Sequence, residues 1–297
     1  MERKSRRALL VIIGIIIIAI IAASYLAFSG FKGKQTLKIA TTTSLEDTGL
    51  LPVLEAAFEK ENPDVDVQFI ATGTGQALEY GKKGDVDLVM VHSKTQEEEF
   101  VKEGYGTQRY PFAYNYFYVV GPSTDPAQIN GTNATAAFKK IDATGSANPN
   151  QVKFVSRGDN SGTNTREIQI WNKTGANYNT TIRGQNWYIE SGKGMVDTLN
   201  VANEKSAYTL SDSGTFLAYK DNINLVAFIT QGKDLLNIYS LIPVNPGKFS
   251  RVDYNTSMKW VDFLLSPEGQ KIVGEYGKDK YGQELFIPLA GVNEPTE

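Results

Sequence analysis

The sequence predicts an α/β protein built from two lobes with a ligand cleft between them. Strand-like and helix-like segments alternate from residue 37 onward, and this order favours a mostly parallel sheet with right-handed crossovers. The alternation starts again after residue 150, and 297 residues are enough for two lobes with cores of their own. The 27 glycines fit a fold that has many tight turns between strands and helices.

Hydrophobic spacing and chain-breaking residues locate the elements of the first stretch. Leu50, Leu54 and Phe58 recur on one helix face, and Pro63 follows the end of that helix. We expect helices at 49–60, 75–82 and 96–103, and strands at 37–40, 65–71, 87–91 and 114–120. The last of these strands is long and aromatic, and it ends at Gly121.

The second stretch repeats this logic and closes with two helices separated by Pro267. We expect strands at 153–156, 207–210 and 238–244, and helices at 161–171, 194–204, 214–220, 256–265 and 268–276. The last two helices are expected to pack back on the first lobe. Lobe 1 then comprises residues 36–112 and 246–290, lobe 2 comprises residues 113–245, and the crossing segments near 114–121 and 238–246 are the expected hinges.

A hydrophobic segment precedes the folded part. Residues 8–28 carry no charge, are rich in isoleucine and follow a basic flank at residues 3–7. As a helix, these 21 residues span about 30 Å, which is enough for a bilayer core. We expect residues 1–30 to hold a cytoplasmic flank and a transmembrane anchor that places the rest of the chain outside the cell membrane. The alternative is a signal peptide, cleaved near Ala22, which would leave a secreted or periplasmic protein.

Composition excludes several classes of function. The chain has no cysteine and one histidine, His92, so disulfides, cysteine-rich metal sites and multi-histidine metal sites cannot be built. A formal net charge of −3 offers no basic surface for nucleic acid. Catalysis by Ser161 would need His92 as its base, and nothing in the sequence marks these two residues as partners. We therefore expect no enzyme and no cofactor, with His92 as a structural residue at a strand end.

Three turns that follow predicted strands are rich in hydroxyl groups and glycine. Ligands of open α/β sheets bind beyond the carboxyl ends of strands, at helix N-termini. The first turn, Thr41 to Ser44, has four hydroxyl residues in a row, although a helix cap needs only one. Its hydroxyl and backbone N–H groups can therefore face an anion.

The second turn, Thr72-Gly73-Thr74-Gly75, is a weaker signal, because an ordinary turn explains it equally well. The third turn runs from Ser156 to Thr163. It combines hydroxyls and backbone donors with Arg157, whose planar guanidinium suits an oxyanion. Asp159 can cap the following helix and orient Arg157 at the same time.

These motifs resemble those of the substrate-binding proteins of tungstate/molybdate ABC transporters, in particular the tungstate-selective type. The matching segments lie at 40–51, 73–78, 84–93, 154–163, 207–215 and 263–270, with further matches at Trp187, Tyr188, Gly192, Gly194 and Met195. The resemblance covers about residues 36 to 280 in order. It implies a type II periplasmic-binding-protein fold that closes on an oxyanion.

The chain departs from this family at three positions. The family usually has histidine where Asn164 stands, glycine where Val196 stands and arginine where Ser213 stands. Asn164 is still able to donate a hydrogen bond. If the family arginine holds the anion or the closed state, Ser213 removes that contact.

Tungstate and molybdate carry no proton at neutral pH, so their site should present donors and few acceptors. Phosphate carries a proton that such a site leaves unmatched. We assign as donors Thr42, Thr43, Ser44 and Thr72 from lobe 1, and Arg157, Ser161, Gly162 and Thr163 from lobe 2. Weaker candidates are Thr74, Ser156, Tyr208 and Asp212; the Tyr208 side chain suits the core equally well.

The leading hypothesis is a monomeric, tethered capture protein on the extracytoplasmic face, which delivers tungstate or molybdate to an ABC permease and its ATPase. One alternative is a binding protein for phosphate or sulfate. A different class, an oxyanion-sensing ectodomain, would need a signalling partner.

Overall fold

The computed structural model describes residues 33–295. The expected membrane segment at residues 8–28 lies outside the described residues. Among residues 33–295, none of the helices is both long and apolar enough to cross a membrane.

The first part of the described chain alternates strands and helices as the sequence predicts. Its elements are β1 (Gln35–Thr42), α2 (Thr43–Thr48), α3 (Leu50–Glu61), β2 (Val65–Thr72), α4 (Thr74–Lys83), β3 (Leu88–Val91), α5 (Lys94–Lys102) and β4 (Tyr110–Pro122). The short helix α2 was not predicted. Gly49, with a φ of 81°, separates it from α3, so the hydroxyl-rich turn is itself the start of a helix.

The middle of the chain adds α6 (Ala134–Ala147), β5 (Phe154–Ser156), α7 (Gly162–Lys173), the π-helical turn η1 (Tyr178–Ile182), β6 (Tyr188–Glu190), α8 (Met195–Glu204), β7 (Tyr208–Asp212), α9 (Ser213–Tyr219), the 3₁₀ turn η2 (Lys220–Asn222) and β8 (Leu225–Ile229). The last part adds η3 (Lys233–Leu235), β9 (Leu236–Pro243), α10 (Tyr254–Leu265), α11 (Pro267–Glu275), α12 (Lys278–Tyr281) and β10 (Ile287–Pro288).

The strands form a ten-stranded sheet in the order β2-β1-β3-β9-β4-β7-β5-β6, with β8 and β10 paired to β4. β1 runs parallel to β2 and β3, and β5 runs parallel to β6 and β7. All pairings of β4 and β9 are antiparallel. The expectation of a mostly parallel sheet was therefore wrong for its centre, because two strands cross there without βαβ connections.

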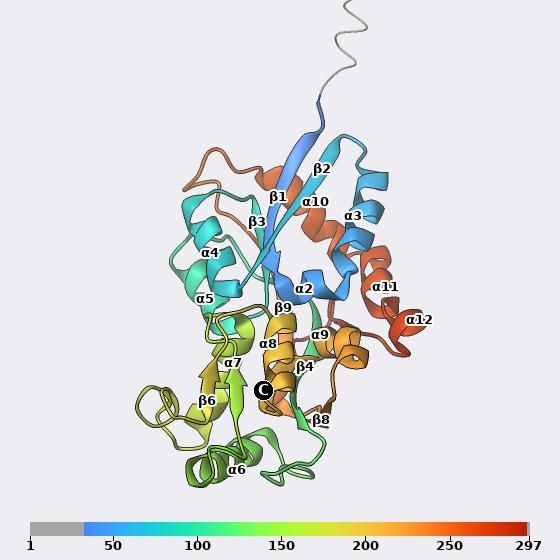
Figure 1. Cartoon of the computed structure of the whole chain (residues 1–297). Helices are drawn as coiled ribbons and strands as arrows, with labels where there is room; N and C mark the ends of the chain where they lie inside the picture. The colour runs from blue at the N-terminus through green and yellow to red at the C-terminus, as the bar shows by residue number, and fades with distance from the viewer. Residues whose placement is uncertain (1–32, 296–297) are drawn as a thin grey trace, which may run out of the picture.

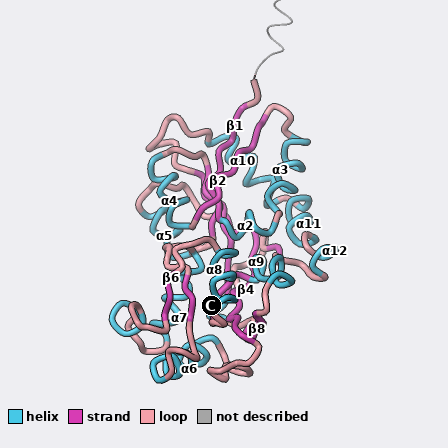
Figure 2. The backbone as a smooth tube through the Cα atoms, in the orientation of Figure 1, coloured by secondary structure: helices cyan, strands magenta, loops and turns pink. Residues whose placement is uncertain are grey.

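The chain folds into two halves, one above the other in Figures 1 and 2. Trp260 of α10 packs on Phe58 of α3 with ring centroids 5.0 Å apart, which joins the C-terminal helices to the first half. The second half has its own aromatic core, in which Phe138, Phe154 and Trp171 are in mutual contact. Between the halves, β4 pairs with β9 at residues 110–116 and with β7 and β8 at residues 117–122.

Candidate functional site

The predicted turns lie where the two halves meet. In the first half, Thr42 ends β1 and Thr72 ends β2, and these two residues are paired in the parallel register. In the second half, Arg157 follows β5 and Asp212 ends β7, which are parallel neighbours. This is the end of the strands at which open α/β sheets bind their ligands.

Three helices present N-termini that no side chain caps. Thr42 before α2, Gly73 before α4 and Gly194 before α8 make no side-chain hydrogen bond to a backbone N–H of the first helical turn. The first N–H groups of these helices are left for other acceptors, and they carry the positive end of the helix dipole. By contrast, Ser161 caps α7 and Asp212 caps α9 through their own oxygens.

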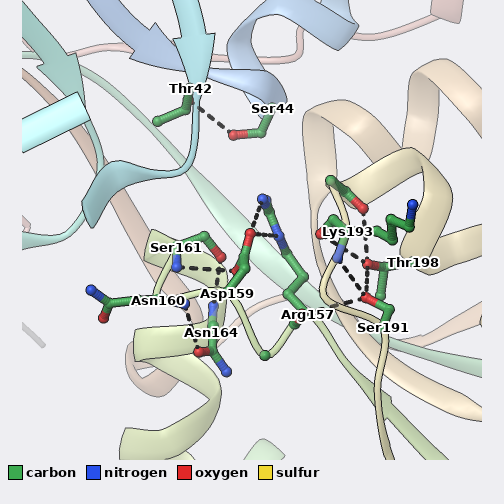
Figure 3. Close-up of polar contacts among 12 residues, drawn as sticks. Thr42, Ser44, Arg157, Asp159, Asn160, Ser161, Asn164, Ser191, Lys193 and Thr198 are labelled. Atoms are coloured by element: carbon green, nitrogen blue, oxygen red, sulfur yellow. Dashed lines mark hydrogen bonds and ion pairs between the residues drawn. The ribbon is translucent and has the colours of Figure 1, made fainter. Parts of the chain in front are cut away.

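The turn after β5 places Arg157 beside Asp159. Arg157 donates from Nη2 at 2.6 Å and from Nε at 3.2 Å to the same oxygen, Asp159 Oδ2. The other oxygen, Asp159 Oδ1, accepts the N–H of Ser161 at 3.1 Å (Figure 3). One carboxylate therefore orients the guanidinium and also holds the backbone of Ser161. The expectation that Asp159 caps α7 was wrong, because Ser161 is the cap of that helix.

A buried carboxylate that the sequence analysis missed, Glu167, supports this turn. Ser156 Oγ donates to Glu167 at 2.6 Å and accepts hydrogen bonds from the N–H of Gly158 at 3.1 Å and from Asn164 Nδ2 at 3.2 Å. The Tyr188 hydroxyl donates to Glu167 at 2.7 Å. Because Glu167 is fully buried, its pKa is raised to about 7. An acidic residue among apolar ones on the inner face of the predicted helix 161–171 was the only sequence signal.

Several hydroxyl groups at the junction are buried without a hydrogen-bond partner. Among the side chains of residues 33–295, this holds for Thr43 Oγ1, Thr74 Oγ1, Thr163 Oγ1 and Thr215 Oγ1. The first three belong to the three predicted turns. A buried hydroxyl without a partner is unfavourable, so these side chains fit a ligand that accepts hydrogen bonds.

Carboxylates next to the site make its charge depend on pH. Burial is the largest cause that raises the pKa of Asp212 to about 6, although Thr215 and Arg157 lower it. Burial and then the charge of Asp212 raise the pKa of Asp47 to about 7. Asp47 is only partly removed from water and keeps an exposed surface, whereas Asp212 is fully buried, so we expect Asp212 to have the stronger influence on a bound anion.

Two weaker candidates have other partners. The Tyr208 hydroxyl donates to Asp125 at 2.7 Å and accepts the N–H of Ala127, within the aromatic core of the second half. The Ser156 hydroxyl is engaged by Glu167. Neither hydroxyl is available to a ligand in this arrangement, so we leave both residues out of the proposed set.

The three departures from the family pattern occupy different places. Asn164 works within the Arg157 turn, since its Oδ1 accepts the N–H of Asn160 at 3.1 Å. Ser213 is buried as the first residue of α9. Val196 is half-buried near the start of α8. The N-terminus of α8 was missing from the predicted donors, although Gly194 before an apolar helix was a visible signal.

The halves approach each other closely beside these turns. A Cβ atom on Gly75 would lie 2.5 Å from Asn160 Nδ2 and 3.0 Å from the Asn160 carbonyl oxygen. A Cβ atom on Gly73 would lie 3.5 Å from Ser161 Cβ. Gln96 of α5 also donates to Thr165 of α7 at 2.6 Å. The second turn therefore lies against the third turn, and its glycines allow the contact.

A cavity of about 390 Å³ lies next to this junction, between α5, α7 and β9. It shares His92 and Gly162 with the junction, but the predicted hydroxyl donors and Arg157 do not line it. The cavity is therefore distinct from the junction of the three turns. Within the described part of the chain, no cluster of three or more His, Asp or Glu side chains is arranged to hold a metal ion.

The fold and this junction define a class of binding protein, and comparison with known sequences agrees. The family described as the PBP superfamily domain matches residues 30–268. The chain belongs to the PBP superfamily, whose periplasmic-binding-protein-like fold the sequence motifs implied.

Known relatives define a narrower group. The tungstate-binding protein TupA of Peptoclostridium acidaminophilum is 39% identical over 262 residues, which cover 87% of either chain. The solved tungstate ABC transporter structure from Geobacter sulfurreducens is 43% identical, with a TM-score of 0.72 over 82% of this chain and 100% of that chain. The solved structure of TupA from Desulfovibrio alaskensis G20 is 39% identical, with a TM-score of 0.71 over 86% of this chain and 99% of that chain. Within the superfamily, the chain belongs to the family of these tungstate-binding proteins, which are solute-binding proteins of transport systems rather than enzymes.

Proposed function

We propose that this chain captures tungstate at the junction of its two halves and delivers the anion to an ABC importer. The observation that carries the proposal is the set of buried hydroxyls without partners, Thr43, Thr74 and Thr163, one in each of the three turns at the junction, together with the buried Arg157 of the third turn. These groups can all donate hydrogen bonds to one anion. Hydrogen bonds to a charged partner contribute about 1.5–3 kcal/mol each, so several of them support tight capture.

The donors come from both halves. From the first half we propose Thr43, Thr72, Thr74 and the first N–H groups of α2 and α4. From the second half we propose Arg157, Ser161, Gly162, Thr163 and the first N–H groups of α8. Ser161 accepts the N–H of Asn164 as a helix cap, which leaves its own hydrogen for the ligand. Thr42 and Ser44 are not in this set, because their hydroxyl oxygens lie 3.1 Å from each other.

Closure of the halves follows from this division of donors. We propose the two lobes that the sequence suggested, residues 36–112 with 246–290 and residues 113–245, with β4 and β9 as the hinge strands. Since each lobe supplies only part of the donors, the anion binds fully only when the lobes are together. The contact of Gly75 with Asn160 supports such a closed arrangement.

The proposed site favours a ligand without protons. Tungstate accepts hydrogen bonds at all four oxygens, whereas phosphate near pH 7 also needs an acceptor for its proton. Asp212 is a carboxylate within reach of the charge of Arg157, and its own pKa of about 6 makes it a proton carrier at mildly acidic pH. Protonated Asp212 is a further hydrogen-bond donor. The site therefore discriminates most strongly against phosphate at a pH at which Asp212 keeps its proton.

Location and assembly are also proposals. We propose that the protein acts on the extracytoplasmic face of the cell membrane as a monomer, held there by the uncharged segment 8–28. The intact mass of the native protein tests the tether. A mass that lacks residues 1 to about 24 would show a cleaved signal peptide instead.

Thermal unfolding with different oxyanions tests the proposed function. A ligand that binds only the folded state stabilises it by RT ln(1 + [L]/Kd), which is about 2.7 kcal/mol at a hundredfold excess over Kd. We expect tungstate to raise the unfolding midpoint, and equal concentrations of sulfate and phosphate to have little effect. A rise with phosphate and none with tungstate would refute the proposal.

A further inference from the structure

His92 joins the first predicted turn to the strands that pass between the halves. It follows β3 and is 4% exposed. Its Nδ1 atom lies 2.9 Å from Asn237 Oδ1 on β9, and its Nε2 atom lies 3.0 Å from Ser44 Oγ in α2. Which ring nitrogen carries the hydrogen decides whether Ser44 gives or receives a hydrogen bond.

The direction of these hydrogen bonds is set at the far end of the chain of contacts. The Leu285 carbonyl can only accept, so Asn115 must present Nδ2 to it, at 3.3 Å. Asn115 Oδ1 then accepts from Asn237 Nδ2 at 2.9 Å. The Asn237 oxygen is therefore the atom that faces His92, and it requires a hydrogen on His92 Nδ1.

The surroundings of His92 oppose a second proton on the ring. Burial first, and then the charge of Arg157, lower the pKa of His92 to about 3, although Asn237 and Asp159 raise it. The rings of Tyr239 and Phe117 pack beside the imidazole at 4.8 and 6.1 Å between centroids. A neutral ring with its hydrogen on Nδ1 leaves Nε2 as an acceptor, so Ser44 must be the donor.

Ser44 has one hydroxyl hydrogen, and this bond uses it. Its oxygen also lies 3.1 Å from Thr42 Oγ1 and can only accept there, so Thr42 donates its single hydroxyl hydrogen to Ser44. We propose that His92 is a positioning residue of the anion site, which accepts the hydrogen bond of the Ser44 hydroxyl. Ser44 then holds the first turn of α2 in place and does not donate to the anion. This inference rests on the proposed function and revises the sequence-based assignments of Ser44 and Thr42 as hydroxyl donors to the anion. Thr43, Arg157 and the backbone N–H groups remain the direct donors.

The network explains how the start of α2 is held in place. α2 has no side-chain cap, so its first turn is not fixed locally. Through Ser44 and His92 it is tied to β9, and through Asn237 and Asn115 to β4. The N–H groups of this turn thus keep a fixed position relative to the strands that connect the halves.

A spectrum of the only histidine tests the direction of the network. In protein labelled with ¹⁵N-histidine, the two ring nitrogens of His92 report which of them carries hydrogen. We expect hydrogen on Nδ1 and none on Nε2 at pH 7, both without ligand and with saturating sodium tungstate. Hydrogen on Nε2 in either sample would overturn the proposal, because Ser44 would then be free to donate to the anion.

Binding measurements on variants test the positioning role. Ser44→Ala and His92→Asn should each weaken tungstate binding about tenfold, and the double variant should be no weaker than the worse single variant, because both changes break one unit. Ser123→Ala removes an exposed hydroxyl and should bind like the wild type. Additive losses would contradict the proposal.

The two tests separate this inference from the proposed function. If tungstate does not bind the wild type at all, the proposed function fails, while the ligand-free spectrum still decides the state of His92. If His92→Asn does not fold, the wild-type spectra and Ser44→Ala remain: the proposal is overturned by hydrogen on Nε2 in the spectra or by wild-type affinity of Ser44→Ala.

Discussion

Arg157 and Asp159 form an ion pair within a single turn, with Arg157 Nη2 2.6 Å from Asp159 Oδ2. The arginine side chain is 2% exposed and the aspartate side chain 20% exposed, so the guanidinium lies almost entirely out of water. A buried arginine needs such a partner, but one carboxylate oxygen uses only two of its five N–H groups. The remaining donors give the guanidinium its capacity to bind an anion.

Removal of Arg157 should weaken capture strongly. We expect Arg157→Ala to raise the Kd for tungstate at least about a hundredfold, the loss of roughly two charge-assisted hydrogen bonds. Arg157→Lys should recover only part of the affinity, because an ammonium lacks the planar fork. Calorimetric titration measures both. Arg251→Ala, at an exposed arginine that pairs with Asp85, is the control and should bind normally. Unchanged affinity in Arg157→Ala would remove Arg157 from the ligand contacts.

Gly75 should be required for close contact between the halves. In Gly75→Ala, the new methyl group would meet Asn160, both at Nδ2 and at the backbone carbonyl oxygen, so the turn or the helix must shift. We expect an affinity for tungstate about tenfold lower, with a nearly unchanged unfolding midpoint in the absence of ligand. Gly33→Ala, where a Cβ atom meets nothing within 4 Å, is the matched control. Equal affinities of the two variants would speak against closure at this contact.

Glu167 should make stability fall as pH rises toward neutrality. Its folded pKa of about 7 lies above the ordinary value of 4.5, so the folded state binds more protons between these values. The free energy of unfolding should therefore decrease between pH 4.5 and 7, by about 3 kcal/mol from this group. Glu167→Gln, which resembles the protonated acid, should lose this component in urea denaturation at pH 5 and 8. Glu204→Gln, at an exposed glutamate, is the control and should keep the pH dependence of the wild type. An identical pH profile in Glu167→Gln and the wild type would contradict the raised pKa of Glu167.

Asp212 should link tungstate binding to pH. Its pKa of about 6 means that the free protein loses this proton above pH 6, while a bound dianion favours the protonated form. The Kd should therefore rise between pH 6 and 8, by up to about tenfold per pH unit. Asp212→Asn should flatten this dependence in titrations at pH 6, 7 and 8. A wild-type Kd that is constant over this range would mean that Asp212 does not sense the ligand.

Local patterns in the sequence were sufficient to predict most elements and the turns that form the site. The strand ends at Thr42 and Thr72 and the turn of Arg157 could be located because hydroxyl and glycine residues interrupt clear hydrophobic periods. The antiparallel crossing of β4 and β9 was not predictable in this way, since the partner of a strand depends on contacts distant in sequence.

The supporting residues of the site were hidden for the same reason. Glu167 stabilises the Arg157 turn, and His92 reaches Ser44 from 48 positions away. A single polar residue in an apolar segment has the same local appearance whether it is buried or exposed. Its role depends on the side chains that the fold brings to it, and in both cases most of these come from other elements.

Calorimetric titration of the purified protein with tungstate and with phosphate at pH 7 tests the central claim most directly, namely that the junction is a donor site for an oxyanion without protons. The account predicts one tungstate bound per chain, and phosphate bound at least about a hundredfold more weakly, a difference of about 2.7 kcal/mol. Phosphate binding that equals or exceeds tungstate binding would contradict the account, because it would mean that ionised Asp212 or another group of the site accepts the hydrogen bond of the phosphate proton.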